Sequence, residues 1–336
     1  RFLGDEIWLI LEELRSERKT GHSARMLFEV LGDLWVVNRN PYLQDDLLEN
    51  PKRLKMLIQA MHHRIQSIED RSFGNMKVAQ LTTAALSAIK IFESEFKKIK
   101  KLRKQVMSRL KRYTKKHNIQ FDGLARVSHV TDATDWRVEY PFVVINPDTE
   151  EEISDIVKEC IALELTIIPR GGGTGYTGGA IPLTPFSAVI NTEKLDHIGE
   201  IEYKNLPGVD KAIPTIHCGA GVVTRRAMDL ASDAGLEFAT DPTSADACCI
   251  GGNVAMNAGG KKAVIWGTAI DNLVSWRMVD PDGNWVFIER LDHNLGKIHD
   301  IHKARFKITR FSSSSETPKT EPEILEIPGK SFRKIG

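Results

Sequence analysis

The residues that most plainly indicate chemistry form a glycine-rich loop at residues 169–179, PRGGGTGYTGG. Three of its glycines, Gly173, Gly175 and Gly178, have the spacing G-x-G-x-x-G that is typical of dinucleotide-binding loops. Consecutive glycines can adopt positive φ and turn several backbone N–H groups toward one point, which makes a concave site for an anion. The loop is therefore predicted to bind a phosphate or diphosphate group.

The loop does not fit the Rossmann motif for nicotinamide dinucleotides. That motif requires a helix that begins within the glycines, so that the helix N-terminus meets the pyrophosphate. Here the glycines lead into AIPLTPFS, in which Pro182 and Pro185 each lack a backbone N–H and oppose a helix. Asp196, which lies near the spacing of the ribose-binding acid, consequently has no β-α-β unit to place it.

A second stretch with few large side chains, residues 241–260, has the sequence DPTSADACCIGGNVAMNAGG. Two Gly-Gly pairs and two asparagines lie in its second half. Backbone amides there can approach a ligand closely, because no Cβ intervenes at the glycines. Two separate segments of this kind predict a large flat ligand that is held mainly by main-chain groups.

The elements that carry these segments follow a helical N-terminal part. Apolar spacing predicts helices over about 5–21 and 23–31, and Asn50-Pro51 predicts a helix start with a capping side chain and a first-turn proline. A much longer helix is expected over about 76–117. Its apolar residues repeat every seven positions, and a helical hairpin or a dimer would bury them. The repeat consists of Val78, Ala85, Phe92, Ile99, Val106 and Tyr113.

The second half of this long helix is strongly basic. Residues 97–116, KKIKKLRKQVMSRLKRYTKK, contain eleven Lys or Arg residues and no acidic residue. A nucleic acid, an anionic membrane surface or an acidic protein would each be attracted to it. We favour a solvated helix face, because the apolar repeat runs through the same stretch and no aromatic side chains interleave for base stacking.

From about residue 122 the pattern changes to short strands, turns and glycines. Strands are expected in FVVINP and LTIIP, on either side of a helix in DTEEEISDIVKECIALE. Strands in SAVIN and AIPTIHCGAG, a helix in VTRRAMDLASDAG, and a hairpin of NLVSWRMV and WVFIER around the turn DPDG are expected to follow. Because no regular β-α-β repeat is present, we predict an α+β protein with a helical region at 1–120 and a second domain at 125–336.

Three motifs in this order resemble the FAD-binding domain of the vanillyl-alcohol-oxidase superfamily, the PCMH-type domain: PRGGGTGYTGG, DPTSADACCIGGNVAMNAGG and WGTAIDNLVSWRMVDPDG. They are similar to the D-lactate dehydrogenase and glycolate-oxidase-subunit branch. The likeness covers about residues 125–290 and implies a domain of two α+β subdomains. The helical N-terminal part is similar to that of long bacterial FAD/FMN-containing dehydrogenases, which continue into a cap and an iron–sulfur region.

The resemblance implies that the two glycine-rich segments bind FAD. The first would contact the pyrophosphate, and the second would run along the diphosphate and the isoalloxazine. Relatives that attach the flavin covalently through the first loop have a histidine at the position of Thr174, so the resemblance implies non-covalent FAD here. The implied cofactor-binding residues are Pro169, Arg170, Gly171, Gly172, Gly173, Thr174, Gly175, Pro242, Thr243, Ser244, Gly251, Gly252, Asn253, Asn257, Gly259, Gly260, Gly267 and Asp271.

The same resemblance implies an oxidoreductase that oxidises a D-2-hydroxy acid and passes electrons to an iron–sulfur centre or a quinone. Family members close the FAD domain with a further glycine-containing strand, which we do not find before residue 336, so the domain is expected to be truncated at its C-terminal end. The catalytic base and any metal ligands belong to a cap that would follow. No catalytic residue is therefore assigned in this chain.

Other polar residues are weaker candidates. Histidine is the usual base for a hydroxy acid, and DHNLGKIHDIH offers His293, His299 and His302 among acids. Their spacing fits no compact metal site, and we interpret the segment as a polar connection between strands. His217 is expected to be a core histidine. Three polar residues of TDATDW are expected to order the start of the domain through turn hydrogen bonds: Asp132, Thr134 and Asp135.

Composition sets the remaining limits. The 336 residues are 41% hydrophobic and 27% charged with a net charge of +1, and no apolar run approaches the ~18–20 residues that cross a bilayer. No C-x-x-C pair is present, which argues against an iron–sulfur or zinc site in this chain. We expect a cytoplasmic protein, with or without peripheral membrane contact, and buried reduced thiols at Cys160, Cys218, Cys248 and Cys249.

Two other functions stay open at this stage. In the first, the basic helix binds a membrane or, less expectedly, a nucleic acid, and the flavin fold is a scaffold. In the second, the same fold is an NADPH-dependent flavin reductase. The electron donor that reduces the flavin would distinguish the reductase from the hydroxy-acid dehydrogenase.

Overall fold

The computed structural model describes residues 2–16, 21–293, 297–311 and 317–328. The chain divides into two compact units. The first comprises residues 1–108 and 121–127, and the second comprises 109–120 and 128–336. The first unit is helical and the second mixes strands and helices, which confirms the predicted α+β class.

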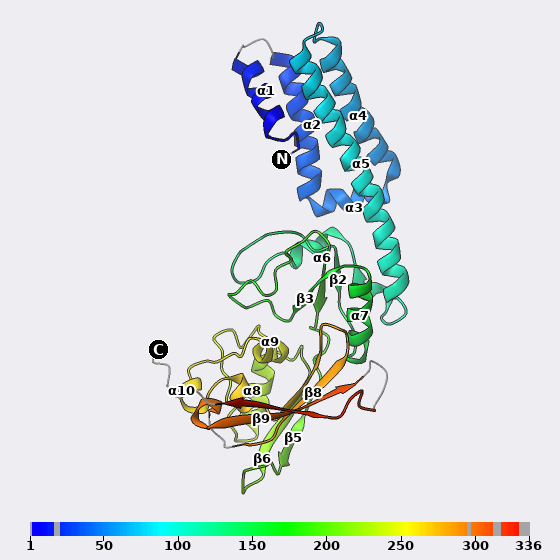
Figure 1. Cartoon of the computed structure of the whole chain (residues 1–336). Helices are drawn as coiled ribbons and strands as arrows, with labels where there is room; N and C mark the ends of the chain where they lie inside the picture. The colour runs from blue at the N-terminus through cyan, green and yellow to red at the C-terminus, as the bar shows by residue number, and fades with distance from the viewer. Residues whose placement is uncertain (1, 17–20, 294–296, 312–316, 329–336) are drawn as a thin grey trace. The chain divides into compact units, whose positions relative to one another are not determined.

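In the helical unit, Figure 1 shows α1, α2, α4 and α5 lying side by side. Their inward faces form one apolar core, in which Met61, Ile65 and Ile89 are completely buried. Phe92 and Phe96, one turn apart on α5, pack with ring centroids 4.8 Å from each other. The helix bounds are α1 Asp5–Ser16, α2 Gly21–Arg39, α3 Pro41–Glu49, α4 Pro51–Asp70, α5 Met76–Leu110 and α6 Gly123–Ser128.

The apolar repeat of α5 is buried within the chain. Ala85, Phe92 and Val106 are each 2% exposed or less. The first two belong to the same core cluster as residues of α1, α2 and α4. Of the two arrangements that the repeat allowed, packing against other helices of the same chain is the one found.

Two predicted helix ends are wrong. Helix α2 continues past residue 31 to Arg39, because Leu34 extends its apolar face and is buried. Helix α5 ends at Leu110 rather than near 117. A turn follows, in which Thr114 N donates to Leu110 O at 3.1 Å. The side chain of buried Asn118 then donates to Thr114 Oγ1 at 2.9 Å, which fixes the turn before the chain enters the first strand.

Helix α3 was not predicted, and its N-terminus has the cap that we assigned elsewhere. Asn40 Oδ1 accepts hydrogen bonds from Tyr42 N at 3.0 Å and from Leu43 N at 3.2 Å. Asn50 does not cap α4 with its side chain. Its Nδ2 instead donates to Asp46 O at 3.1 Å, at the end of α3. Both Asn-Pro pairs begin helices, but only the first uses the asparagine as an N-cap.

The second unit contains a small sheet with the strand order β1-β2-β4-β3. Strands β2, β4 and β3 are parallel, and β1 is antiparallel to β2. Every residue of β4 is buried, as expected for a central parallel strand. The bounds are β1 Ile119–Gln120, β2 Val143–Ile145, α7 Glu151–Ala162, β3 Thr166–Arg170 and β4 Ser187–Asn191.

The remainder of the unit consists of a two-stranded ribbon, short helices and an antiparallel sheet of order β10-β9-β8-β7. The predicted hairpin of β7 and β8 is confirmed, and in its turn Asp280 Oδ1 accepts from Asp282 N at 3.0 Å and Asn284 N at 2.7 Å. The bounds are β5 Ile198–Lys204, β6 Ile213–Cys218, α8 Thr224–Asp233, α9 Ile250–Ala255, α10 Ala263–Trp266, η2 Ala269–Asn272, β7 Ser275–Val279, β8 Trp285–Arg290, η3 Ile298–Asp300, β9 Lys303–Phe311 and β10 Glu323–Pro328.

Two strands that were not predicted follow the hairpin, and neither is the glycine-containing strand of the family pattern. Strand β9 pairs with β8 from Trp285↔Phe311 to Arg290↔Phe306, and β10 pairs with the other edge of β9. Phe306 is 3% exposed, so β9 contributes to the core. The strand contains no glycine, and a search for a glycine-containing strand therefore passes over it.

A cluster of charged residues around Asp148 stabilises the β1 end of the first sheet. Lys194 Nζ lies 2.9 Å from Asp148 Oδ1 and donates to Asn118 Oδ1 at 2.6 Å. On the other side, Lys115 Nζ lies 2.7 Å from Asp148 Oδ2. Hydrogen bonds from Lys115 and Lys194 hold the pKa of Asp148 well below its usual range. The carboxylate thus stays charged between its two lysines throughout the neutral range.

Replacing this carboxylate should have a pH-dependent effect on stability. Asp148→Asn is expected to destabilise the chain at about pH 7, because the amide loses both ion pairs. The native pKa lies below the unfolded value of about 4, so the contribution is complete above that pH and disappears as the pH falls toward the native pKa. Urea denaturation of both proteins from about pH 7 to about pH 3 should show their midpoints converging. A midpoint difference that stays constant with pH would contradict the account.

Candidate cofactor-binding site

The first glycine-rich segment lies at the carboxyl ends of two parallel strands. Strand β3 ends at Arg170, which pairs in register with Asn191 at the end of β4. The loop begins at the next residue, and no helix forms between β3 and β4, as the two prolines predicted. The carboxyl edge of parallel strands is where ligands bind in many α/β proteins, so the loop is well placed for a ligand.

The two glycine-rich segments touch each other. A Cβ on Gly172 would lie 2.0 Å from the carbonyl oxygen of Ala247, and one on Gly171 would lie 3.2 Å from Cys249 Cβ. A real Cβ at Gly172 would overlap that oxygen, so only glycine allows the main chains to approach this closely. The sequence suggested a shared ligand for these segments, and the structure adds a direct contact between them.

Several predicted site glycines are required by packing inside the protein. A Cβ on Gly251 would lie 2.8 Å from Ala220 Cβ, and one on Gly260 would lie 2.1 Å from Asp241 O. At Gly267, which has a φ of +78°, a Cβ would lie 2.2 Å from Asp271 Oδ2. At these positions the missing side chain makes room for protein atoms.

Other glycines leave main chain open to a ligand. Among the described residues, apart from chain neighbours and the backbone of α9 itself, no heavy atom lies within 4 Å of the Cβ position of Gly175 or of Gly252. The N–H groups of Gly173, Thr174, Gly175 and Gly252 donate to no acceptor among the described residues. Several N–H donors without acceptors, at positions where side chains are small or missing, are what a diphosphate requires of a main-chain site. These residues therefore fit the FAD that the motifs imply.

Arg170 supports the first loop from within the protein. Its Nη1 donates to Thr131 O at 2.7 Å, and its guanidinium lies 2.4 Å from where a Cβ on Gly173 would stand. Burial lowers the pKa of Arg170 and the charge of Asp132 opposes that change, but an arginine remains charged. The site thus has a fixed positive charge beneath the loop, which favours an anionic ligand.

The polar residues between β1 and β2 order a turn, as predicted. Asp132 Oδ1 accepts from Thr134 N at 2.9 Å and from Thr134 Oγ1 at 2.6 Å, and Asp135 adopts a φ of 63°. Burial alone would raise the pKa of Asp132. Hydrogen bonds from Thr134 and Ala180, together with the charge of Arg170, outweigh burial and lower that pKa.

In the second segment, the two asparagines have partners in the protein. Asn253 is 5% exposed and its Nδ2 donates to Thr224 Oγ1 at 2.6 Å. Asn257, with a φ of 50°, accepts from Ile270 N at 3.0 Å. Their side-chain amides hold the backbone of this segment.

The start of the segment is a turn, and Asp271 closes its far end. Ser244 O accepts from Cys248 N at 2.8 Å, and Thr243 is exposed beside it. Asp271 Oδ2 accepts from Thr268 N at 2.7 Å as half of a capping box, and its Oδ1 accepts from Ile298 N at 2.5 Å. The Asp271 carboxylate is thereby engaged by protein donors. Of the other predicted residues, Pro169 is exposed, Pro242 is half-buried, and Gly259 has only ordinary contacts at its Cβ position.

The histidine predictions have different outcomes. His217 was expected in the core, which is wrong, because its side chain is exposed on the β5–β6 ribbon. His293 is 7% exposed, and burial followed by the charge of Arg290 lowers its pKa, so the ring is neutral at pH 7. His302 is exposed, and the side chain of His299 lies outside the described residues. Within the described residues, no three His, Cys, Asp or Glu side chains are placed to hold a metal.

The cysteines are free thiols, and three of them are buried as predicted. Burial raises the pKa of Cys160 to about 12. Cys218 is half-buried, which corrects the prediction for that residue, and burial raises its pKa to about 11. Burial also raises the pKa of Cys249, although a hydrogen bond from the Gly172 backbone opposes it. All three groups are therefore neutral thiols at neutral pH.

Sequence reasoning missed the third chain segment of the site, residues 219–224. Gly219 and Gly221 pack against carbonyl oxygens of Leu195 and Thr192, and Thr224 contacts the second glycine-rich segment. The signal that could have revealed this segment is the short run GAG directly before the amphipathic helix α8.

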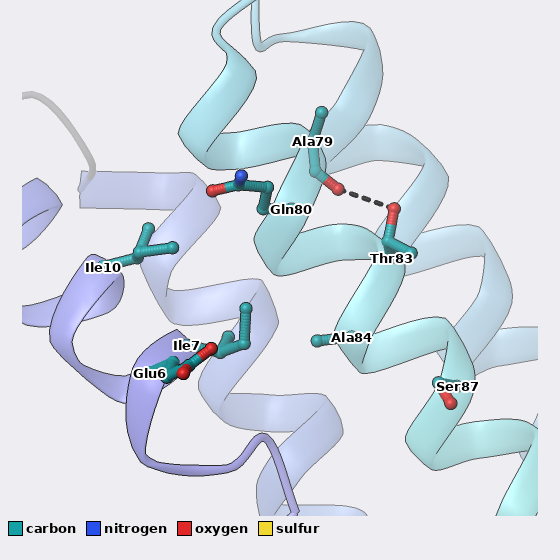
Figure 2. A pocket seen from close by; sticks show the side chains of 8 residues that line it. All are labelled: Glu6, Ile7, Ile10, Ala79, Gln80, Thr83, Ala84 and Ser87. Atoms are coloured by element: carbon teal, nitrogen blue, oxygen red, sulfur yellow. Dashed lines mark hydrogen bonds between the residues drawn. The ribbon is translucent and has the colours of Figure 1, made fainter.

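The helical unit has an open groove between α1 and α5 (Figure 2). Glu6 is the one charged residue among those that line it.

Comparison with known proteins agrees with this geometry. Residues 141–289 match the family model described as FAD binding domain. This part of the chain is an FAD-binding domain of the PCMH type. The resemblance inferred from the three motifs is confirmed, and so is FAD as the cofactor. Residues 1–94 match a family described as protein of unknown function (DUF3683).

Curated relatives match part of the chain. D-lactate dehydrogenase of Archaeoglobus fulgidus is 37% identical over 142 residues, which are 42% of this chain and 30% of that protein. Glycolate oxidase subunit GlcD of Bacillus subtilis is 30% identical over 213 residues, 63% of this chain and 42% of that protein. The chain thus spans less than half the length of these relatives. Among solved structures, an alkyldihydroxyacetonephosphate synthase superposes with a TM-score of 0.47 and 21% identity, covering 55% of this chain and 37% of that one.

Alanine substitutions should separate the packing glycines from the ligand-facing glycines. Gly172→Ala forces a Cβ against Ala247 O and is expected to cost about 1–3 kcal/mol or more of stability without FAD. Gly175→Ala, whose Cβ position is open, should leave stability within about 0.5 kcal/mol and weaken FAD binding about tenfold or more. Urea denaturation of the FAD-free chain and flavin fluorescence titration measure the two effects.

A second ligand-facing variant is Gly252→Ala, which places alanine in helix α9 at another open position. Alanine in a helix is favourable by roughly 0.5–1 kcal/mol, so this variant should be as stable as the wild type or more so, yet bind FAD less tightly. Wild-type FAD affinity in both Gly175→Ala and Gly252→Ala would refute the ligand-facing role of these amides.

Proposed function

We propose that this chain is the FAD-binding portion of a flavin-dependent oxidoreductase that oxidises a D-2-hydroxy acid and passes the electrons to an iron–sulfur centre or a quinone. The relatives named D-lactate dehydrogenase and glycolate oxidase subunit support the substrate class. A third relative, D-2-hydroxyglutarate dehydrogenase of Rattus norvegicus, is 28% identical over 141 residues and extends the same class.

The observation that carries the proposal is the contact between the two glycine-rich segments. The packing of Gly172 on Ala247 supports assigning the unpaired N–H groups of the first loop and of Gly252 to one site. A diphosphate is bound by such donors, and the positive charge of Arg170 under the loop adds to the attraction. When bound, FAD supplies the acceptor of two electrons from the hydroxy acid.

The residue at position 174 supports a non-covalent flavin. Thr174 stands in the first loop where relatives with a covalently attached flavin have histidine, and its hydroxyl cannot replace an imidazole in that linkage. Acid precipitation of the FAD-loaded chain should therefore release all of the flavin into the supernatant. Yellow colour that stays with the precipitated protein would contradict a non-covalent site.

A single set of electron donors distinguishes the dehydrogenase from the reductase alternative. The chain is expressed together with any sequence that naturally adjoins it and is loaded with FAD. Under anaerobic conditions it is then mixed with D-lactate, glycolate, D-2-hydroxyglutarate or NADPH. We expect a hydroxy acid to bleach the flavin absorption band, and NADPH to leave it unchanged. Bleaching by NADPH alone would replace this proposal with the reductase.

The proposed location is the cytoplasm, with peripheral membrane contact if the acceptor is a quinone. None of the described helices is long and apolar enough to span a membrane. The rival function, binding through the basic stretch of α5, has one observation in its favour. Lys97 pairs with Glu93 and Arg103 with Asp45, whereas exposed Lys98, Lys100 and Lys101 form no ion pair with a described carboxylate.

We expect these lysines to be a solvated face rather than a binding site, because the opposite side of α5 is buried in the core. The chain should consequently bind neither duplex DNA nor vesicles rich in anionic lipid at about 150 mM salt. Binding that is tight at about 50 mM salt and falls steeply with added salt would establish the rival function. Reversal of Lys98, Lys100 and Lys101 to Glu should then abolish it.

A further inference from the structure

A single hydroxyl connects the two ends of the turn that carries Gly251 and Gly252. Thr224, the first residue of α8, is completely buried. Its Oγ1 accepts from Asn253 Nδ2 at 2.6 Å and lies 3.1 Å from Cys248 O. A hydroxyl has one proton to donate and two lone pairs to accept with, so Thr224 can serve Cys248 and Asn253 at once.

We propose that Thr224 is a positioning residue of the cofactor site. It holds Asn253 turned into the protein and fixes the backbone from Cys248 to Asn253, so that the N–H of Gly252 faces the ligand. This inference rests on FAD binding by residues 141–289, and it assigns a role to a residue outside all three sequence motifs. It also gives Asn253 an indirect role: its side chain acts through Thr224 and not by contact with the cofactor.

Backbone hydrogen bonds hold the turn as well, and the side-chain contact of Thr224 adds to them. Thr224 N donates to Cys248 O at 2.9 Å, and Ile250 N and Gly251 N donate to Val222 O and Ala220 O at 2.9 Å each. These bonds hold the first half of the turn and use its amides. At the other end Asn253 N donates to Cys249 O at 3.0 Å, and the Asn253 side chain connects this end to α8. Among the described residues, the Thr224 hydroxyl is the hydrogen-bond partner of that side chain.

The same hydroxyl influences the first glycine-rich segment through Cys248 and Cys249. A Cβ on Gly172 would lie 3.3 Å from Cys248 Cα, and one on Gly171 would lie 3.2 Å from Cys249 Cβ. A shift of Cys248 would therefore displace the surface on which the first loop packs. Loss of the Thr224 hydroxyl is expected to affect both walls of the site.

The test compares three variants of Thr224 for FAD affinity and for the visible circular dichroism of bound FAD. Thr224→Val keeps the shape and removes the hydroxyl, and it should weaken FAD binding about tenfold or more and alter the spectrum at saturating FAD. Thr224→Ser keeps the hydroxyl and should restore wild-type affinity within about threefold. Thr224→Cys, whose sulfur is a weak acceptor, should be intermediate and keeps the test open if Thr224→Val does not fold.

Thr215→Val is the matched control, because it removes a threonine hydroxyl that donates to Glu202 O at 3.1 Å in the β5–β6 ribbon. A merely structural role for Thr224 would lower thermal stability and leave the spectrum of bound FAD unchanged. The inference alone would be overturned by wild-type FAD binding in Thr224→Val, or in Thr224→Cys if only that variant folds. Equal losses of FAD binding in Thr224→Val and Thr215→Val would also overturn it. Failure of the wild-type chain to bind FAD would instead overturn the cofactor site together with this inference.

Discussion

The approach of Gly172 to the carbonyl oxygen of Ala247 is the constraint on which the proposed site depends. A methyl group at residue 172 would overlap that oxygen, so the contact exists only because the position has no side chain. It brings together two segments that lie more than seventy residues apart in the sequence. Everything that the site offers to a ligand, including the unpaired amides and the charge of Arg170, is arranged around this contact.

Glycines in the two segments consequently have two different physical roles. Gly172, Gly251 and Gly260 let main chains approach each other, while Gly175 and Gly252 leave main chain uncovered. The sequence shows the same residue type in both cases. Only the three-dimensional neighbours decide which absent side chain makes room for protein and which makes room for a ligand. A similar division applies to the polar residues, since Asn253 and Asp271 are bound to protein donors and acceptors.

Much of the fold was predictable because local patterns decide it. The helix α7, the strands around it and the β7–β8 hairpin follow from apolar periodicity and turn residues, and Asp280 in the hairpin turn accepts the hydrogen bonds that such a turn requires. The buried face of α5 also follows from its repeat. These features depend on neighbours in sequence.

The errors concern features that depend on contacts distant in sequence. An Asn-Pro pair predicts a helix start, but whether the asparagine caps it depends on competing partners, and Asn50 bonds to Asp46 instead. His217 lies in strand β6, in which no residue is buried, so its side chain is exposed. Strand β9 was missed because the family pattern required a glycine, whereas pairing with β8 requires only backbone. The role of Thr224 was likewise invisible, since its partners Cys248 and Asn253 lie on a segment far along the chain.

The most direct test of the site is a titration of the chain with FAD, with the glycine nitrogens isotopically labelled and the backbone amides followed by NMR spectroscopy. The account predicts that the signals of Gly175 and Gly252 move on binding, and that those of Gly4 and Gly74 in the helical unit do not. Tight binding of FAD without movement of the Gly175 and Gly252 signals would show that the flavin nucleotide is held somewhere other than at these amides, and the account would be wrong.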